Sequence, residues 1–123
     1  MISPDAMLPP LCGAHGVFIA IDGQGCWIKG EPGSGKSRLA LWLIQYAKAA
    51  LVADDLVLFR RKKYKIYGQG LKHMRGIMHV RGLGFLDIVA LAGRKALVFE
   101  APWRITIEIS DASCHLKRPV WVR

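Results

Sequence analysis

Residues 30–37 read Gly-Glu-Pro-Gly-Ser-Gly-Lys-Ser, and no other stretch limits the possible folds of this chain as strongly. They match the phosphate-loop pattern G-x-x-x-x-G-K-[S/T] at every fixed position. Glycines let the backbone wrap around a phosphate and turn N–H groups toward it, and the helix that follows adds its positive end. The pattern predicts that Lys36 reaches the β- and γ-phosphates of a nucleotide and that the Ser37 hydroxyl ligates Mg²⁺. The predicted nucleotide- and phosphate-binding residues are Gly30, Glu31, Pro32, Gly33, Ser34, Gly35, Lys36 and Ser37.

The segments on both sides of this loop fit the motif. Residues 17–21 are apolar and predict a strand, residues 22–25 (Asp-Gly-Gln-Gly) predict a tight turn, and residues 26–29 predict the returning strand. The loop is therefore entered from the second arm of an antiparallel hairpin, whereas most phosphate-loop folds enter it from a parallel strand. Residues 37–49 carry apolar side chains at helical spacing and predict a helix.

The rest of the chain predicts more strands than helices. Strands are expected at 51–53, 56–59, 64–67, 96–100, 104–109 and 120–122, with a basic turn at 60–63 and a loop or short helix at 68–76. The length of 123 residues suits a single domain spanning 1–123. The expected fold class is α/β, with a mixed sheet that contains antiparallel hairpins.

Two adjacent carboxylates, Asp54 and Asp55, end the strand that follows the predicted helix. Such a strand is expected beside the strand that leads into the loop, so that its end faces the phosphates. One carboxylate can then hold Mg²⁺ and the other can take a proton from an incoming hydroxyl. The alternative is a solvated turn or a helix cap, because Asp-Asp pairs are common in proteins.

The formal net charge of +9 favours anionic partners such as phosphates, nucleic acid or an acidic protein surface. No nucleic-acid recognition motif accompanies the charge, so nucleic acid is not the expected partner. The basic run at 60–63 is either a solvated hairpin tip or a docking site for an acidic partner. No apolar run approaches the roughly 20 residues that cross a bilayer, and the first ten residues lack the pattern of a secretory signal. The chain is therefore expected in the cytoplasm, without membrane contact.

Five segments occur in an order that resembles a known family. They are His15-Gly16-Val17, the Asp-Gly-x-Gly hairpin, the glycine-rich loop, the segment 51–55 (Leu-Val-Ala-Asp-Asp) and the segment 80–88 (Val-Arg-Gly-Leu-Gly-Phe-Leu-Asp-Ile). The last segment, placed after a phosphate loop, is highly specific. The chain resembles the catalytic domain of HPr kinase/phosphorylase, in a short form like that of several proteobacterial members, over about residues 15–88.

The resemblance implies an enzyme that moves phosphate from ATP or pyrophosphate to a serine of the small carrier protein HPr. In reverse, inorganic phosphate would remove that phosphate and release pyrophosphate. The implied fold is the phosphate-loop domain related to phosphoenolpyruvate carboxykinase, and the implied assembly is a hexamer. Asp54 matches the general base, Asp55 supports Mg²⁺ together with Ser37, and His15 and Arg81 match residues near the transferred phosphate.

One residue departs from the family pattern. His79 occupies the position before Val-Arg-Gly where the family usually has Glu, which could ligate a metal. A neutral imidazole suits Mg²⁺ poorly. A nucleotide-binding regulatory module with weakened catalysis therefore stays open as an alternative function. A small-molecule kinase that uses the same loop is a further alternative.

Overall fold

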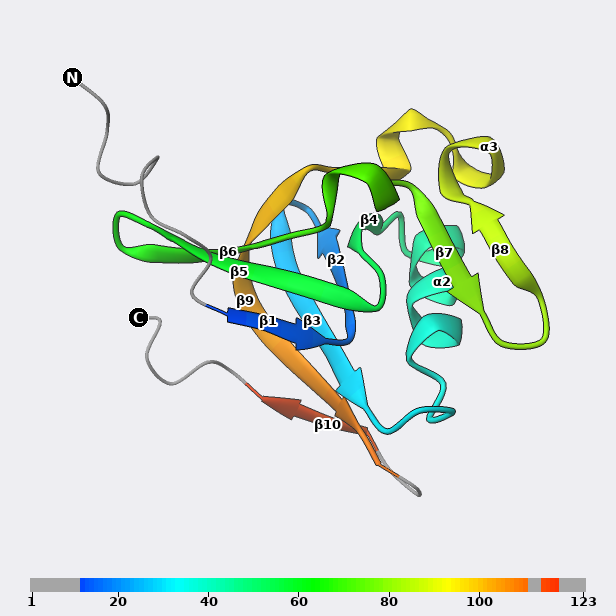
Figure 1. Cartoon of the computed structure of the whole chain (residues 1–123), viewed down its shortest axis with the longest axis horizontal. Coiled ribbons are helices and arrows are strands. Elements are labelled where there is room, and N and C mark those ends of the chain that lie inside the picture. Colours follow the sequence, from blue (N-terminus) through cyan, green and yellow to red (C-terminus); the bar gives the residue numbers. More distant parts are fainter. Residues whose placement is uncertain (1–11, 111–113, 118–123) are drawn as a thin grey trace.

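The computed structural model describes residues 12–110 and 114–117, and it shows a mixed sheet with a helix on one face (Figure 1). The strand order is β1-β5-β6-β9-β3-β2-β4, with β10 paired to β9 and a separate β7–β8 hairpin. The strands are β1 (Cys12–His15), β2 (Val17–Ile21), β3 (Gln24–Gly30), β4 (Ala50–Ala53), β5 (Leu56–Lys62), β6 (Lys65–Gln69), β7 (Ile77–Val80), β8 (Gly84–Asp87), β9 (Glu100–Ile109) and β10 (Cys114–Lys117). The helices are α2 (Lys36–Tyr46) and α3 (Ile88–Ala92), with 3-10 turns η1 (Lys72–Met74) and η2 (Arg94–Ala96).

The predicted hairpin before the loop is confirmed. Strands β2 and β3 pair antiparallel, with Val17 opposite Ile28. Their turn places Asp22 and Gly23 at positive φ values of 50° and 76°, which Asp and Gly tolerate better than most residues. On its other side, β3 pairs with β9 in parallel, so the strand that leads into the loop is held on both edges. The expected mixed sheet with antiparallel hairpins is therefore present.

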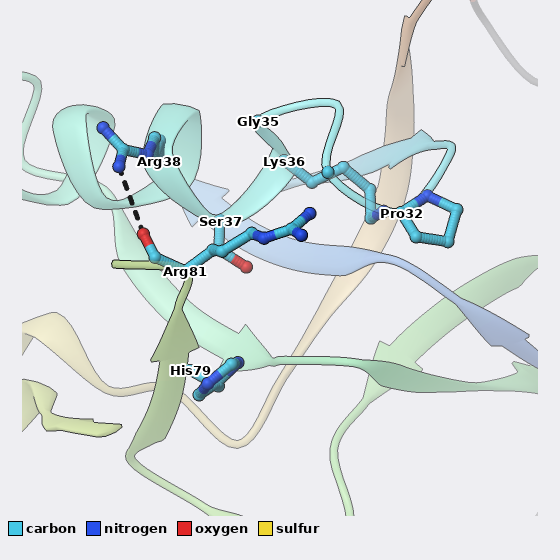
Figure 2. A pocket seen from close by; sticks show the side chains of 8 residues that line it. Pro32, Gly35, Lys36, Ser37, Arg38, His79 and Arg81 are labelled. Carbon is cyan, nitrogen blue, oxygen red and sulfur yellow. Dashed lines mark hydrogen bonds between the residues drawn. The ribbon is translucent and has the colours of Figure 1, made fainter. Parts of the chain in front are cut away.

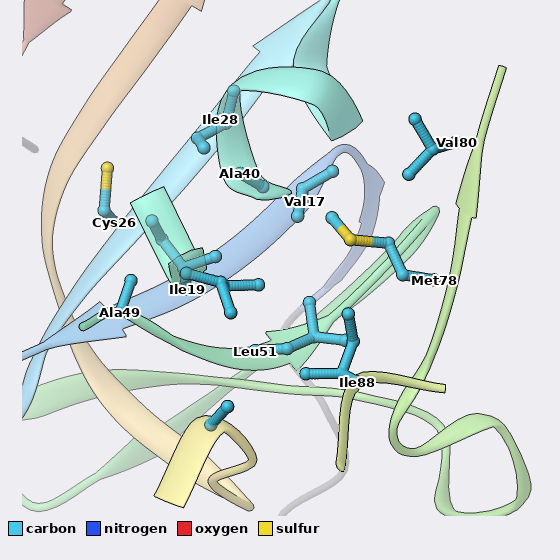
Figure 3. Close-up of a cluster of buried hydrophobic side chains, with 12 residues drawn as sticks. Val17, Ile19, Cys26, Ile28, Ala40, Ala49, Leu51, Met78, Val80 and Ile88 are labelled. Atoms are coloured by element: carbon cyan, nitrogen blue, oxygen red, sulfur yellow. The ribbon is translucent and has the colours of Figure 1, made fainter. Parts of the chain in front are cut away.

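Alternating side chains of β2 enter two different cores. Val17 and Ile19 pack with Ala40 and Ile44 of α2, whereas Phe18 points to the opposite face. Figure 3 shows the first core, in which Met78, Val80 and Ile88 close the cluster on the side away from β3. Because β2 is buried on both faces, its five residues are all apolar.

The second core forms where the sheet curls over itself. Strands β5 and β6 cross Phe18, which is fully buried and meets the ring of Phe59 edge-on at a centroid distance of 5.9 Å. A Cβ atom at Gly25 or Gly68 would lie only 2.4 or 2.5 Å from the Phe18 ring. Gly25 in β3 and Gly68 in β6 therefore leave room for the ring, so that both strands can bury it.

Several predicted boundaries are wrong. The helix ends at Tyr46 rather than residue 49, because Lys48 adopts a positive φ of 56° and the N–H of Ala49 turns back to the carbonyl of Leu43. The strand expected at 96–100 does not form, since residues 94–96 make the turn η2 and a single long strand covers Glu100–Ile109.

Other elements differ from the prediction as well. The basic run does not form the turn itself: Arg60 to Lys62 belong to β5, and the hairpin turns at residues 63–64. Strand β1, the short helix α3 and the division of the segment 77–87 into β7 and β8 were not predicted. The possible strand at 120–122 lies outside the described residues. Within the described part of the chain, no helix is long and apolar enough to cross a membrane.

Candidate functional site

The glycine-rich loop joins the end of β3 at Gly30 to the start of α2 at Lys36. Gly33 and Gly35 adopt φ values of 80° and 98°, which side-chain-bearing residues rarely reach, and Gly35 is the N-cap of the helix. No side chain caps the helix, and its first turn contains no acidic residue. The N–H groups at this end are therefore available to a bound anion.

Lys36 extends back along the loop. Its Nζ donates hydrogen bonds to the carbonyl of Gly30 at 2.8 Å and to the carbonyl of Glu31 at 3.1 Å. These two bonds hold the ammonium group against the loop backbone, and Figure 2 shows the Lys36 side chain extending along the loop toward Pro32. The lysine thereby places a positive charge beside the uncapped end of the helix, where the sequence pattern predicts phosphate.

Asp54 reaches the loop by a different route from the one expected. Strand β4 does not lie beside β3, because β2 is between them. Both pairs are antiparallel, so β4 runs in the same direction as β3 and ends at the same edge of the sheet. The chain beyond β4 therefore delivers Asp54 to the first turn of α2 from two strands away.

The Asp54 carboxylate is held by two donors. Its Oδ1 accepts a hydrogen bond from the Ser37 hydroxyl at 3.3 Å, and its Oδ2 accepts one from the backbone N–H of His79 at 2.8 Å. Burial is the largest influence and raises the pKa of the Asp54 carboxyl above its usual 3.8, and the charge of Asp55 acts in the same direction. The two hydrogen bonds lower the pKa but do not cancel the effect of burial. Such a carboxylate is more basic than an exposed one.

Asp55 differs from Asp54 in its backbone conformation and in the exposure of its carboxylate. Its backbone has a positive φ of 72°, and the N–H of Leu56 bonds to the carbonyl of Asp54, which is the pattern of a γ-turn. Its carbonyl accepts the N–H of Gly16 at 3.0 Å, which ties this turn to the start of β2. Its carboxylate is 86% exposed and lies 3.9 Å from Nδ1 of His15. The turn thus aims the two adjacent carboxylates in different directions.

The β7–β8 hairpin crosses the loop from the other side. Its backbone supplies the N–H of His79 to Asp54, and its turn brings Arg81 beneath the loop in the view of Figure 2. A Cβ atom at Gly33 would lie 2.7 Å from Nη1 of Arg81, so the glycine makes room for this guanidinium. Arg38 in α2 donates from Nη2 to the Arg81 carbonyl at 3.1 Å and fastens the hairpin to the helix.

Two neighbouring cavities flank the loop and share Pro32, Lys36, Ser37 and His79. The larger has a volume of about 660 Å³ and contains both carboxylates, and the smaller has a volume of about 380 Å³ and contains the arginines. The larger is also lined by His15, Gly16, Val17, Gly30, Asp54, Asp55, Met74, Ile77 and Phe85. The smaller is also lined by Gly33, Gly35, Arg38 and Arg81.

Most predicted site residues are therefore brought together, in two groups. His15, Asp54 and Asp55 line the larger cavity, and Arg81 lines the smaller one. Two loop residues line neither: Glu31 faces another hollow beside Lys29, and the Ser34 hydroxyl is buried without a hydrogen-bond partner.

Sequence reasoning missed three contributions to the site. Arg38 directly follows the motif, the backbone N–H of His79 holds Asp54, and the Phe85 ring lies against the His79 imidazole at a centroid distance of 4.8 Å and a tilt of 50°. Only Arg38 had a sequence signal, namely a cation one residue beyond the phosphate-loop pattern. The other two depend on the pairing of β7 with β8, which places His79 opposite Phe85.

The Mg²⁺ ligands predicted from the sequence are Ser37 and Asp55. Both line the larger cavity, but the carboxylate closest to the Ser37 hydroxyl is that of Asp54. Hydroxyl and carboxylate oxygens are hard donors that suit Mg²⁺, and this ion needs few protein ligands because it keeps several waters. The types of donor that line this cavity therefore suit the ion.

Comparisons with known proteins identify the family of this chain. The family model of the HPr Serine kinase C-terminal domain matches residues 7–118. The HPr kinase/phosphorylase of Leptothrix cholodnii is 46% identical over 84 residues, which cover 68% of this chain and 26% of that protein. That of Mycoplasmopsis pulmonis is 34% identical over 97 residues, which cover 79% of this chain and 31% of that protein.

A solved structure matches as well. The Hpr(Ser) kinase/phosphatase from Coxiella burnetii superimposes with a TM-score of 0.74 at 30% identity, over 79% of this chain and 64% of that one. The present chain spans about a third of the length of the curated relatives that it matches. Because the family model covers most of the chain, the chain belongs to the HPr serine kinase C-terminal domain family.

Proposed function

We propose that this domain transfers phosphate from ATP or pyrophosphate to a serine of HPr or an HPr-like carrier protein, and removes it again by phosphorolysis. The observation that carries the proposal is the position of Asp54. This half-buried carboxylate has a raised pKa, bonds to Ser37 of the loop and shares a cavity with Lys36. A base beside a phosphate-binding loop is the arrangement that transfer to a hydroxyl requires.

In the forward direction, Asp54 takes the proton of the serine hydroxyl as its oxygen attacks the terminal phosphorus. The bond from that phosphorus to the leaving ADP or phosphate breaks, and the carrier keeps one phosphoryl group. In the reverse direction, an oxygen of inorganic phosphate attacks the phosphoserine phosphorus. Asp54 then returns a proton to the serine oxygen, and pyrophosphate leaves.

The other residues bind and orient the reactants in this proposal. Lys36, the loop N–H groups and Arg81 hold the phosphates, and His15 lies in the larger cavity near the group that is transferred. Mg²⁺, held by Ser37 and Asp55, would supply neutralisation of the developing phosphate charge. The fold is of the phosphate-loop type shared with phosphoenolpyruvate carboxykinase, and the entry into the loop from the β2–β3 hairpin supports this.

The wider features of the proposal follow from the resemblance. Residues 1–123 act as one domain, several copies assemble as a hexamer, and the site of action is the cytoplasm, where ATP and carrier proteins meet. Light scattering of the purified chain is expected to give six times the monomer mass, and a strict monomer contradicts the assembly.

The test is intact-mass analysis of purified HPr incubated with this protein, Mg²⁺ and either ATP or pyrophosphate. The expected result is a gain of one phosphate, which disappears when inorganic phosphate is added in excess. The Lys36→Ala variant serves as the control that lacks the loop ammonium. ATP binding without transfer to HPr would replace this proposal with the nucleotide-binding module that the histidine at position 79 suggests.

A further inference from the structure

The smaller cavity is lined by cations and by no carboxylate. Lys36 and Arg38 come from the start of α2, and Arg81 comes from the β7–β8 turn. Figure 2 shows the Arg81 side chain extending below the glycine-rich loop, with the Arg38 guanidinium directed toward the Arg81 carbonyl. Residues of two separate elements thus line the same hollow, with the Arg38 guanidinium toward one end and the Arg81 and Lys36 side chains extending toward the other.

The charges of these arginines are not balanced within the described protein. Among residues 12–110, neither Arg38 nor Arg81 forms an ion pair with an acidic side chain. Like charges gathered in a concave site repel one another, and the repulsion is offset when an anion binds between them. The larger cavity has the opposite character, because it contains Asp54 and Asp55.

Arg38 is well suited to hold such an anion. A guanidinium has five N–H donors, and the hydrogen bond to the Arg81 carbonyl uses only one of them. That bond also orients the group, so less freedom is lost when the remaining donors engage an oxyanion. Gly35 lines the same hollow, and a Cβ atom built there would meet no atom within 4 Å, so this position leaves space for a compact ligand.

We propose that Arg38 is a diphosphate-binding residue, which together with Arg81 and Lys36 grips the diphosphate group of a nucleotide or of free pyrophosphate in the smaller cavity. The inference rests on the proposed function for the identity of the anion as a phosphate donor. It assigns the two cavities different tasks: the cationic one holds the diphosphate, and the one with the carboxylates admits the hydroxyl that is phosphorylated.

The test is calorimetric titration of the whole chain with pyrophosphate, ATP and AMP, in the presence of a chelator and without carrier protein. Arg38→Gln removes the charge but keeps an amide donor for the Arg81 carbonyl. Charge-assisted hydrogen bonds to phosphate are strong, so this variant is expected to bind pyrophosphate and ATP about tenfold more weakly, by a similar factor for both. The binding of AMP, which has no diphosphate, is expected to stay unchanged.

Two variants make the result specific. Arg61→Gln makes the same charge change at an exposed position of β5 that lines neither cavity, and it is expected to bind both diphosphates like the unmodified chain. Arg38→Lys keeps the charge but loses the planar set of guanidinium N–H donors. Its affinity for pyrophosphate is therefore expected to fall by a smaller factor than that of Arg38→Gln. The affinity of Arg38→Gln is also expected to depend less on salt, which a purely structural effect would not produce.

The inference is overturned if Arg38→Gln binds pyrophosphate as tightly as Arg61→Gln does. It is also overturned if only ATP binding weakens, since Arg38 would then contact the nucleoside. Weaker pyrophosphate binding in a chain that transfers nothing to HPr would uphold this inference and refute the proposed function. Loss of pyrophosphate binding in Lys36→Ala, with Arg38→Gln unaffected, would refute this inference and leave the proposed function standing.

Discussion

The Asp54→Asn variant is predicted to lose phosphate transfer while keeping its folding stability. The carboxylate is needed for the reaction, but its burial does not favour the ionised form in the folded protein. The carboxylate is the only base in the proposed reaction, yet its raised pKa shows that the folded protein holds the ionised form at a cost. Burial and the charge of Asp55 therefore outweigh the two hydrogen bonds that the carboxylate accepts.

The size of each effect can be worked out. General-base catalysis contributes about 10²–10⁴-fold, which corresponds to about 3–5 kcal/mol of activation free energy. The Asn side-chain oxygen can still accept the N–H of His79, which lies 2.8 Å from Oδ2 in the structure. The free energy of unfolding at neutral pH is therefore expected either to fall by no more than about 0.5 kcal/mol or to rise.

The pH dependence has a definite sign. The folded-state pKa of Asp54 lies above the unfolded value of 3.8, so the folded protein binds more protons between these two values. The contribution of this group to stability therefore falls as pH rises through that window, and Asp54→Asn is expected to remove the fall. Transfer requires the ionised base, so the acid limb of its pH profile is expected above pH 3.8.

Urea unfolding and the intact-mass assay measure the two effects. Asp55→Asn is the matched control for the unfolding measurement: its side chain is exposed, and removing its charge is expected to lower the pKa of Asp54 and so move the pH window in which stability falls to lower pH. A loss of more than about 1 kcal/mol of stability in Asp54→Asn would show that Asp54 is structural. Full transfer activity in this variant would refute its role as the base.

Three further substitutions have defined outcomes. Lys36→Ala removes the ammonium bonded to two loop carbonyls, and calorimetry is expected to show at least a tenfold loss of pyrophosphate affinity; unchanged affinity would refute the phosphate loop. Gly68→Ala places a Cβ atom 2.5 Å from the Phe18 ring, and urea unfolding is expected to show a loss of about 1–3 kcal/mol. Glu100→Ala removes the carboxylate 2.6 Å from Nζ of Lys62, and a loss of about 2 kcal/mol is expected by the same measurement, whereas an unchanged midpoint would make this pair irrelevant to stability.

Local patterns of the sequence determined the parts of the protein that depend on near neighbours. The glycine-rich loop, the hairpin before it and the helix after it are each specified within a dozen residues, because turns, caps and apolar periodicity act over short distances. The hydrogen bond from Lys36 to the Gly30 carbonyl is local as well, because the two residues are only six positions apart in the chain. The family resemblance added the roles expected for Asp54, His15 and Arg81.

Only the tertiary structure decided which distant residues meet at the loop. Strand β2 separates β3 from β4, yet the shared direction of β3 and β4 brings Asp54 to Ser37. The division of the loop surroundings into a carboxylate-containing cavity and a cationic one depends on the β7–β8 hairpin, which brings the N–H of His79 to one side and Arg81 to the other. Strand order and hairpin placement are set by the packing of Phe18, Met78 and Ile88 into the two cores. Such packing joins residues far apart in the chain, so no local pattern encodes it.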